Sequence, residues 1–168
     1  MGFMIKKIVS DGQDGVSLGG LLATADLDID HSGFVPMSFD TEQGPEDVIM
    51  KFQKLLKIKT KDPLSVITKN IAISDATLIM TDGKLTKRSR AAVLQSRLFS
   101  KPFFHVDLSK KTDFAAAIGI KRWIKEIRKV LNVSVLNVVG SLESKSPGIS
   151  SRTRSILVMV FENDLANN

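Results

Sequence analysis

Short hydrophobic runs alternate with amphipathic segments along this chain. Four apolar runs have the length and composition of buried β-strands, at residues 5–10, 76–81, 103–108 and 133–140. In the segments that follow them, apolar residues recur at the spacing of one helix face, at residues 16–27, 87–99, 112–131 and 147–161. A brief strand at 29–34, an irregular loop at 39–44 and one or two helices between Pro45 and Ser74 complete the predicted elements.

The helical spacing also predicts which side chains face the core. In the first helix these are Val16, Leu18, Leu21, Leu22 and Ala25. In the second they are Ala91, Leu94, Leu98 and Phe99, and in the third Ile120, Ile124, Ile127 and Leu131. Thr112 is expected to cap the third helix, because a threonine oxygen accepts a hydrogen bond from one of the first free amides. The basic residues of that helix then form a solvated outer face.

Alternating strands and helices are typical of an α/β protein with a doubly wound parallel sheet and helices on both faces. The chain has 168 residues, of which 43% are hydrophobic and 25% charged, and this is the size of one globular domain with its own core. We therefore predict a single domain over residues 1–168, with a frayed tail over residues 162–168.

Charge and composition limit the kinds of molecule that the protein is expected to bind. The formal net charge of +6 at pH 7 favours anionic partners in general. Aromatic residues make up only 6% of the chain, which disfavours single-stranded nucleic acid, since such binding usually needs stacking surfaces. The absence of cysteine excludes disulfides and thiolate metal sites and agrees with a reducing compartment. No apolar run approaches the roughly 20 residues that span a bilayer, so we expect a cytoplasmic protein without membrane contact.

Ligands of open α/β sheets bind beyond the carboxyl ends of the strands, where the chain reverses its direction of winding. Four predicted turns lie at such ends, at residues 11–15, 33–40, 81–89 and 140–151, and we name them the first to fourth turns. The third turn leads into a helix that begins with two cations, and the fourth is rich in serine. A helix start beside basic side chains suits an anion. The sequence therefore predicts a small anionic ligand.

Three motifs resemble the molybdenum cofactor carrier proteins, and they occur in the same order. They are KIVSDGQDGV at 7–16, SDATLIMT at 74–81 and VLNVVGSLESKSPGI at 135–149. The resemblance covers most of the chain and implies a Rossmann-like fold, related to that of the lysine-decarboxylase-like phosphoribohydrolases. It also implies a homo-oligomer, a dimer or tetramer, that binds the molybdenum cofactor, whose molybdopterin is an anionic pterin. Molybdoenzymes or cofactor-synthesis proteins would then be its protein partners.

Carried over position by position, the resemblance implies cofactor-binding residues in all four turns and on one helix. They are Gly12, Gln13, Asp14 and Gly15 in the first turn, Gly33 and Pro36 in the second, Asn70 on a helix, Thr81, Lys87, Arg88 and Ser89 in the third turn, and Gly140, Glu143, Ser144 and Lys145 in the fourth. No catalytic residue and no metal ligand is implied.

The first and third turns depart from the family pattern. Asp11 and Asp14 stand where the pattern has glycine and threonine, while Lys87, Arg88 and Ser89 replace Gly-Gly-Thr. Two unit charges about 4 Å apart interact by about 4 kcal/mol at an effective dielectric constant of about 20. The positive N-terminal end of a helix stabilises an anion by only about 0.3 to 1 kcal/mol. Acids that face the site would therefore repel an anion, and we expect its recognition to have moved to the third and fourth turns.

We interpret the chain as a non-enzymatic binding protein of this family. Two alternatives stay open. One is a nucleotide or phosphoribosyl hydrolase in which Asp11, Asp14 and Glu143 act as acid, base or Mg²⁺ ligands. The other is a scaffold that has lost its ligand. His31 and His105 are the two histidines of the chain, and the position of His105 among apolar strand residues predicts a structural role.

Overall fold

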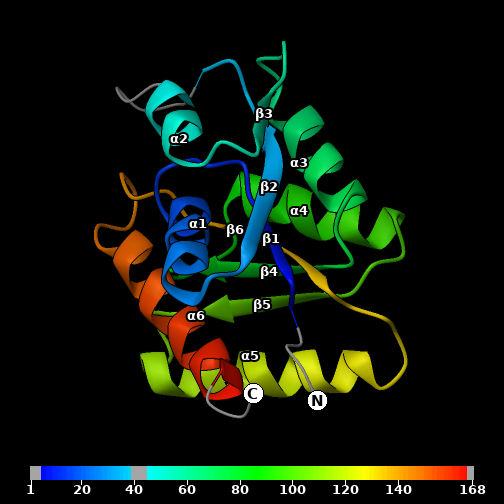
Figure 1. Cartoon of the computed structure of the whole chain (residues 1–168), viewed down its shortest axis with the longest axis vertical. Helices are drawn as coiled ribbons and strands as arrows, with labels where there is room; N and C mark the ends of the chain where they lie inside the picture. The colour runs from blue at the N-terminus through cyan, green and yellow to red at the C-terminus, as the bar shows by residue number, and fades with distance from the viewer. Residues whose placement is uncertain (1–4, 39–44, 166–168) are drawn as a thin grey trace.

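The computed structural model describes residues 5–38 and 45–165, so the irregular loop predicted at 39–44 lies outside the described residues. The strands are β1 (Lys7–Val9), β2 (Asp30–Val35), β3 (Leu55–Lys57), β4 (Ala76–Thr81), β5 (Phe103–Asp107) and β6 (Val135–Gly140). The helices are α1 (Val16–Leu27), α2 (Pro45–Lys51), α3 (Pro63–Ala72), α4 (Lys87–Leu98), α5 (Asp113–Arg128) and α6 (Ile149–Leu165). Strands and helices alternate along the chain (Figure 1).

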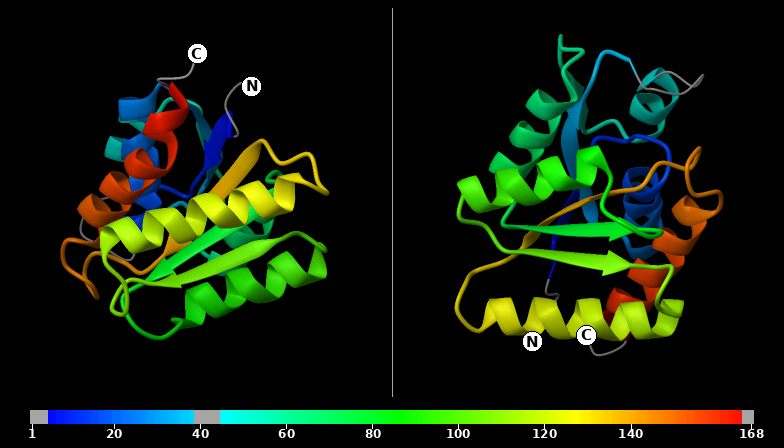
Figure 2. Two further views of the ribbon diagram at one scale, coloured as in Figure 1. Left: turned by 90° about the horizontal axis from the view of Figure 1, so that it is seen from below. Right: turned by 180° about the vertical axis from the view of Figure 1, so that it is seen from behind.

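The six strands form one parallel sheet in the order β3-β2-β1-β6-β4-β5 (Figure 2). The Rossmann-like α/β fold with a parallel sheet, predicted from the sequence, is therefore confirmed. The last strand of the chain lies in the middle of the sheet, because β6 pairs with β1 on one side and with β4 on the other. The turns that follow these three strands consequently meet at one edge of the sheet.

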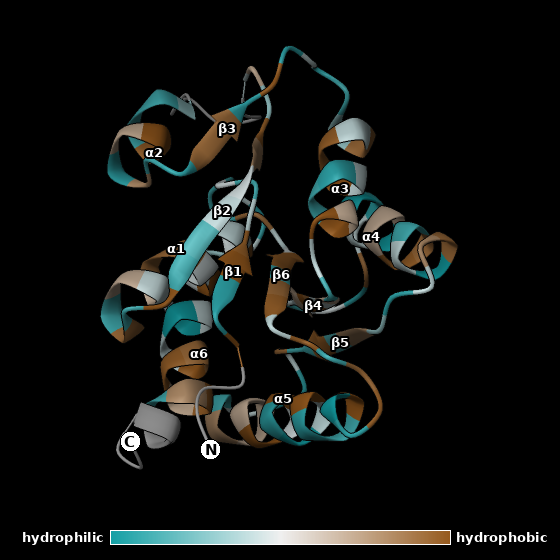
Figure 3. Ribbon diagram, turned by 45° about the vertical axis from the view of Figure 1, so that its right-hand side comes forward, coloured by the Kyte–Doolittle hydropathy of each residue, from teal (hydrophilic) through white to brown (hydrophobic). Residues whose placement is uncertain are grey.

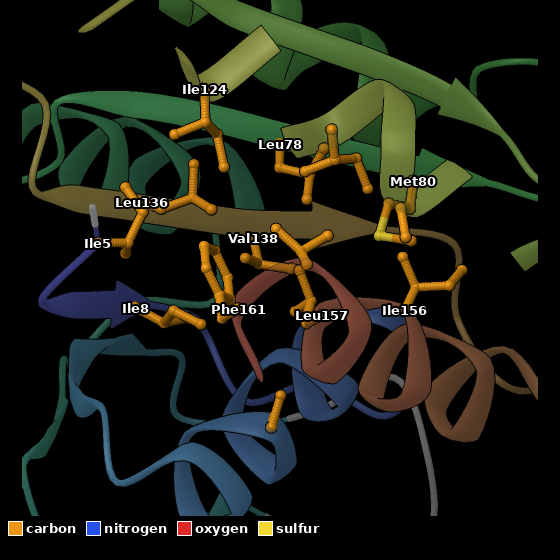
Figure 4. Packing of buried hydrophobic residues seen from close by; sticks show 14 of the residues in the cluster. Ile5, Ile8, Leu78, Met80, Ile124, Leu136, Val138, Ile156, Leu157 and Phe161 are labelled. Carbon is orange, nitrogen blue, oxygen red and sulfur yellow. The ribbon is translucent and has the colours of Figure 1, made fainter. Parts of the chain in front are cut away.

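The central position of β6 explains its nearly continuous apolar sequence, because helices cover both faces of the sheet. β6 is mostly hydrophobic, with the polar Asn137 in its middle, whereas α5 carries both hydrophobic and hydrophilic residues (Figure 3). Successive side chains of a strand point to opposite faces. Leu136 and Val138 pack with residues of β4, α5 and α6 in the larger core (Figure 4). Val139 packs on the other face, with residues of α3 and α4.

The predicted inner face of α4 is wrong except at Ala91, which is partly buried and packs against core residues of α3 and β4. Leu94, Leu98 and Phe99 are 55%, 68% and 41% exposed, and the helix instead buries Ala92 and Ser96. Small side chains at a contact let a helix approach its neighbours closely, because the distance between packed elements depends on the side chains between them. The smallest residues of α4, and not the largest, therefore mark its buried face.

α1 also buries its small residues. Ala25 is exposed, contrary to the prediction, while Gly19, Gly20 and Thr24 are buried. A Cβ atom on Gly19 would overlap the carbonyl oxygen of Ser150 in α6, so the close contact of these two helices requires glycine there. α1 and α6 consequently lie side by side (Figure 1).

The prediction for α5 is confirmed except at its end. Thr112 caps the helix by accepting a hydrogen bond from the amide of Ala115 at 3.2 Å. Ile120 and Ile124 are buried, as their spacing predicts. Leu131, which was expected to face the core, lies beyond the last helical residue and is 48% exposed.

Two other elements differ from the expectation. β3 was not predicted between the two helices of the 45–74 region, because three residues are too few to display the alternation of a strand. α6 continues to Leu165, whereas fraying was expected from residue 162. The helix is therefore longer than the apolar spacing indicates.

Candidate functional site

The first, third and fourth turns meet beyond the carboxyl ends of β1, β4 and β6. Because β6 lies between the other two strands, the fourth turn lies between the first and the third. The amide of Val16 donates to the carbonyl of Ser141 at 3.0 Å, and the amide of Ser141 donates to the carbonyl of Met80 at 3.1 Å. The amide of Glu143 donates to the carbonyl of Asp14 at 3.3 Å. Backbone hydrogen bonds thus join the first turn to the fourth, and the fourth to the end of β4, where the third turn begins.

A cleft of about 700 Å³ opens beside these turns, between the starts of α3 and α4 and the loop after β6. Its apolar members, which we call the apolar wall, are Pro63, Leu64, Ile67, Ala91 and Leu142. Its basic members, the basic rim, are Lys87, Arg88 and Lys145. Gly140, at the end of β6, also lines the cleft. The structure therefore brings residues of the third and fourth turns together around one hollow.

Two helices begin at the cleft, and their caps differ in charge. Thr86 caps α4 by accepting a hydrogen bond from the amide of Ser89 at 3.1 Å, and Ser89 itself is buried. Asp62 caps α3 by accepting from the amides of Leu64 and Ser65, both at 3.1 Å. A carboxylate already offsets the positive end of α3, whereas the cap of α4 is neutral. The start of α4 is therefore the more attractive of the two for an anion.

Arg88 of the third turn forms an ion pair with Asp11 of the first. The side chains are 14% and 3% exposed, so the pair is largely buried. Asp11 Oδ1 also accepts a hydrogen bond from the amide of Gln13 at 3.1 Å. Burial lowers the pKa of Arg88 to about 10, which leaves the guanidinium charged at pH 7. The charge of Asp11 is thus balanced within the protein and does not face the cleft unopposed.

Three buried polar atoms of these turns have no hydrogen-bond partner within the described residues, namely Gln13 Oε1, Arg88 Nε and Arg88 Nη2, and of these Nη2 forms the ion pair with Asp11. An unsatisfied polar group in the protein interior costs free energy. Arg88 lines the cleft, although its Nε is itself buried from solvent. Gln13 is 4% exposed and does not line the cleft.

Glu143 fixes the fourth turn at the start of α6. Its carboxylate accepts hydrogen bonds from the amides of Gly148 and Ser150, the latter at 2.9 Å. The protein's own carboxylate therefore occupies the amides that a helix start would offer to an external anion. Ser144 and Lys145 are exposed, and of the two Lys145 lines the cleft.

The start of α1 is covered by the fourth turn. Gly15 has φ +113°, and a Cβ atom there would overlap the carbonyl oxygen of Ser141. That carbonyl accepts from the amide of Val16, and the carbonyl of Gln13 accepts from the amide of Leu18 at 3.0 Å. These amides at the start of α1 are used inside the protein. Gly15 consequently serves close packing of two turns, and the start of α1 is not an open backbone cradle for a phosphate.

Comparison with known proteins places the chain in a family. The sequence model of the circularly permutated YpsA SLOG family matches residues 8–161, nearly the whole chain. The chain belongs to this family. Among solved structures, it is similar to the crystal structure of a protein from Syntrophus aciditrophicus SB named "Putative molybdenum carrier protein", at 29% sequence identity and a TM-score of 0.83. That similarity covers 94% of this chain and 95% of the other, and the kinship predicted from the three motifs is confirmed. The comparison with curated proteins gave no match.

In this SLOG family member, the second-turn candidates and Asn70 take part in packing. A Cβ atom on Gly33 would overlap the carbonyl oxygen of Ser10, so β2 requires glycine where it passes the end of β1. Asn70 accepts a hydrogen bond from the amide of Phe34 at 2.7 Å and donates to its carbonyl at 3.0 Å. Pro36 is buried. The structure brings none of these three candidates to the lining of the cleft.

Thr81 and the histidines of the SLOG domain also have structural contacts. Thr81 is fully buried and donates to the carbonyl of Gly83 at 2.7 Å, and its Oγ1 lies 2.7 Å from His105 Nε2. Burial lowers the pKa of His105, which keeps its imidazole neutral at pH 7. His31 packs edge-on against the ring of Phe52, with 5.4 Å between ring centroids.

Two features that would suggest other functions are absent from the described residues. Within residues 5–38 and 45–165, no group of three or more histidine, cysteine, aspartate or glutamate side chains is placed to hold a metal ion. The helices described there are all too short or too polar to cross a membrane.

The sequence prediction missed the apolar wall of the cleft. Pro63, Leu64 and Ile67 come from α3, which none of the three recognised motifs includes. Leu64 is a large apolar residue in the first turn of the helix and is 45% exposed in the structure. Single exposed apolar residues are common on protein surfaces, so the sequence held no clear signal for this wall.

Proposed function

We propose that this SLOG family member is a binding protein of the molybdenum carrier type, which holds an anionic, ring-bearing ligand in the cleft without transforming it. A pterin phosphate, as in the molybdenum cofactor, is the ligand class that we infer. The observation that carries the proposal is the meeting of an apolar wall and a basic rim in one cleft of about 700 Å³. Small-molecule sites commonly have this volume and combine apolar lining with a few convergent polar groups.

The residues of the cleft fit such a group. The flat ring of a pterin would lie against the apolar wall, where burial of its faces is favourable. A phosphate would lie at the neutral start of α4, beside Lys87 and Lys145. Arg88 lines the cleft beside these lysines, and its charge is balanced by Asp11. When bound, the cofactor would supply its molybdenum chemistry to another protein, and this chain would only hold and orient it.

The hydrolase alternative has less support in the geometry. Of its three proposed carboxylates, Asp11 is paired with Arg88, and Glu143 accepts from amides at the start of α6. Both are committed to holding the turns together. Asp14 alone is left as a candidate acid or base, and general acid–base hydrolysis of a glycosidic bond uses a pair of carboxyl groups. Binding without turnover is therefore the function that the site supports best.

We expect that Lys87→Ala combined with Lys145→Ala weakens binding of a pterin phosphate by about tenfold, which corresponds to about 1.4 kcal/mol. The two lysines are exposed members of the basic rim, and neither contributes to a buried ion pair. Titration calorimetry with a pterin monophosphate, and separately with molybdate, measures the effect. Arg88 is left unchanged because its removal would also unpair Asp11.

The matched control is Lys59→Ala combined with Lys125→Ala, which removes the same charge from exposed positions outside the cleft. An equal loss of affinity in the control would assign the effect to the overall charge of the protein. No binding of either probe to the unaltered protein would favour the scaffold alternative. Pterin fluorescence and molybdenum in protein purified from its native host would identify the ligand directly.

A further inference from the structure

A second hollow, of about 600 Å³, shares no lining residue with the cleft. It lies where β4 and β5 end, and these two strands run side by side to the same edge of the sheet (Figure 2). Four of the residues that line it are cations, from the β4–α4 loop, from α4 and from the loop between β5 and α5. They are Lys84, Arg90, Lys110 and Lys111. We call this surface the basic hollow.

The one carboxylate that lines the basic hollow is already engaged. Asp107 Oδ1 accepts hydrogen bonds from the Ser109 hydroxyl at 2.6 Å, from the Gly83 amide at 2.8 Å and from the Ser109 amide at 3.0 Å. Its Oδ2 lies 3.7 Å from Lys110 Nζ. The hydrogen bond from the Ser109 hydroxyl is the largest cause of its low pKa of about 2, so Asp107 stays ionised and bound to these donors.

Three cations of the hollow are left without an acidic partner. Lys84, Arg90 and Lys111 form no ion pair with any residue in the described ranges, and all three are exposed. Like charges around one concave surface raise the local potential for an anion, and a cleft concentrates that field. Repulsion among these three cations destabilises the free protein. An anion that neutralises them relieves this repulsion, which makes its binding more favourable.

The wall of the basic hollow is fixed before any ligand arrives. The Gly83 amide is bound to Asp107, and the Gly83 carbonyl accepts from Thr81. His105 lies 2.7 Å from the same threonine oxygen. These bonds hold the β4–α4 loop against the end of β5, so binding need not order the loop that carries Lys84. Leu85 is the apolar side chain of the lining, which offers little area to a ring.

We propose that the basic hollow binds a diphosphate or triphosphate group. Three unpaired cations match a ligand with about three negative charges better than a single phosphate, and Arg90 can bind two phosphate oxygens at once through its planar guanidinium. With one apolar side chain, the hollow recognises the phosphate chain and not a base or a sugar. The site is separate from the cleft of the proposed function, and its ligand need not be the same molecule.

The test is titration calorimetry with inorganic pyrophosphate, ADP and orthophosphate at about 0.15 M salt, where long-range attraction is screened beyond about 8 Å. It uses the full chain carrying Lys87→Ala and Lys145→Ala in every variant, so that binding in the cleft is weakened and contributes equally to each. We expect pyrophosphate to bind at least about tenfold more tightly than orthophosphate. Adding Lys84→Ala, Arg90→Ala and Lys111→Ala should weaken pyrophosphate binding by about 30-fold, or about 2 kcal/mol.

The control adds Lys59→Ala, Arg122→Ala and Lys125→Ala, which remove the same charge from exposed positions outside both hollows. A control loss as large as that of the hollow variant would overturn the proposal, as would equal affinity for pyrophosphate and orthophosphate. ADP that binds as tightly as pyrophosphate supports a nucleotide-borne phosphate chain, and ADP that binds more weakly supports free polyphosphate. Absence of binding by pyrophosphate and ADP at millimolar concentration would also overturn it.

Discussion

Replacing Arg88 with methionine is expected to lower the free energy of unfolding by about 3 to 5 kcal/mol. Asp11 is 3% exposed and forms its ion pair with Arg88, so the substitution leaves a carboxylate buried without its counter-charge. Its remaining described hydrogen bond, from the amide of Gln13, does not compensate for a full charge. Chemical denaturation followed by circular dichroism measures the loss.

A double variant separates loss of the charge pair from loss of packing. In Asp11→Asn with Arg88→Met both charges are gone, while the asparagine oxygen can still accept from the amide of Gln13. We expect it to recover most of the stability, because replacing a buried ion pair by uncharged groups is often nearly neutral. A double variant as unstable as Arg88→Met alone would show that the arginine acts by packing and not by charge.

Gly140→Ala is expected to destabilise the protein by about 3 kcal/mol or more. Gly140 ends β6 in the middle of the sheet, and a Cβ atom there would overlap the carbonyl oxygen of Met80. A backbone atom of a paired strand cannot move aside as a flexible side chain can, so β4 and β6 would have to separate at the edge of the cleft. Thermal and chemical unfolding curves measure the effect.

Gly119→Ala is the matched control for this substitution. Gly119 lies inside α5, where the nearest atom to a new Cβ would be in the ring of Phe104 at 3.9 Å, an ordinary contact. The same added methyl group should stabilise the protein by about 0.5 to 1 kcal/mol, because alanine favours a helix interior over glycine. If Gly140→Ala has the same stability as the unaltered protein, β4 and β6 can separate at the cleft more easily than the structure indicates.

The sequence allowed the fold class to be predicted because each element of the α/β pattern has a local signal. β4 was predicted at its observed bounds, since four apolar residues and two β-branched threonines lie between clear breaks. The inward face of α4 was not predicted correctly, because Ala92 and Ser96 do not stand out as hydrophobic residues in the sequence. Their burial depends on how closely the helix packs. The order of strands was beyond local reasoning as well, since the pairing of β6 with β1 and β4 joins distant segments.

The candidate site was predictable only in part. The basic residues of the third and fourth turns were recognised, and the structure places Lys87, Arg88 and Lys145 at one cleft. The role of Asp11 as a partner of Arg88 was not recognised, because the repulsion between its charge and an anion was considered within the first turn alone. Relative to the family pattern, the first turn has two additional acids and the third two additional cations, and one acid and one cation of these, Asp11 and Arg88, form an ion pair. Paired departures of opposite charge are thus a usable signal for contact between separate turns.

β6 also sets the moment at which the sheet can close during synthesis. The strands before it form two ribbons, β3-β2-β1 and β4-β5, which have no pairing with each other until residues 135–140 have left the ribosome. Until then β1 and β4 each present an unpaired edge, the kind of edge at which nascent chains associate wrongly. The sheet becomes one unit only once β6 is available, and a chain that stops before residue 135 leaves two halves without the strand that joins them.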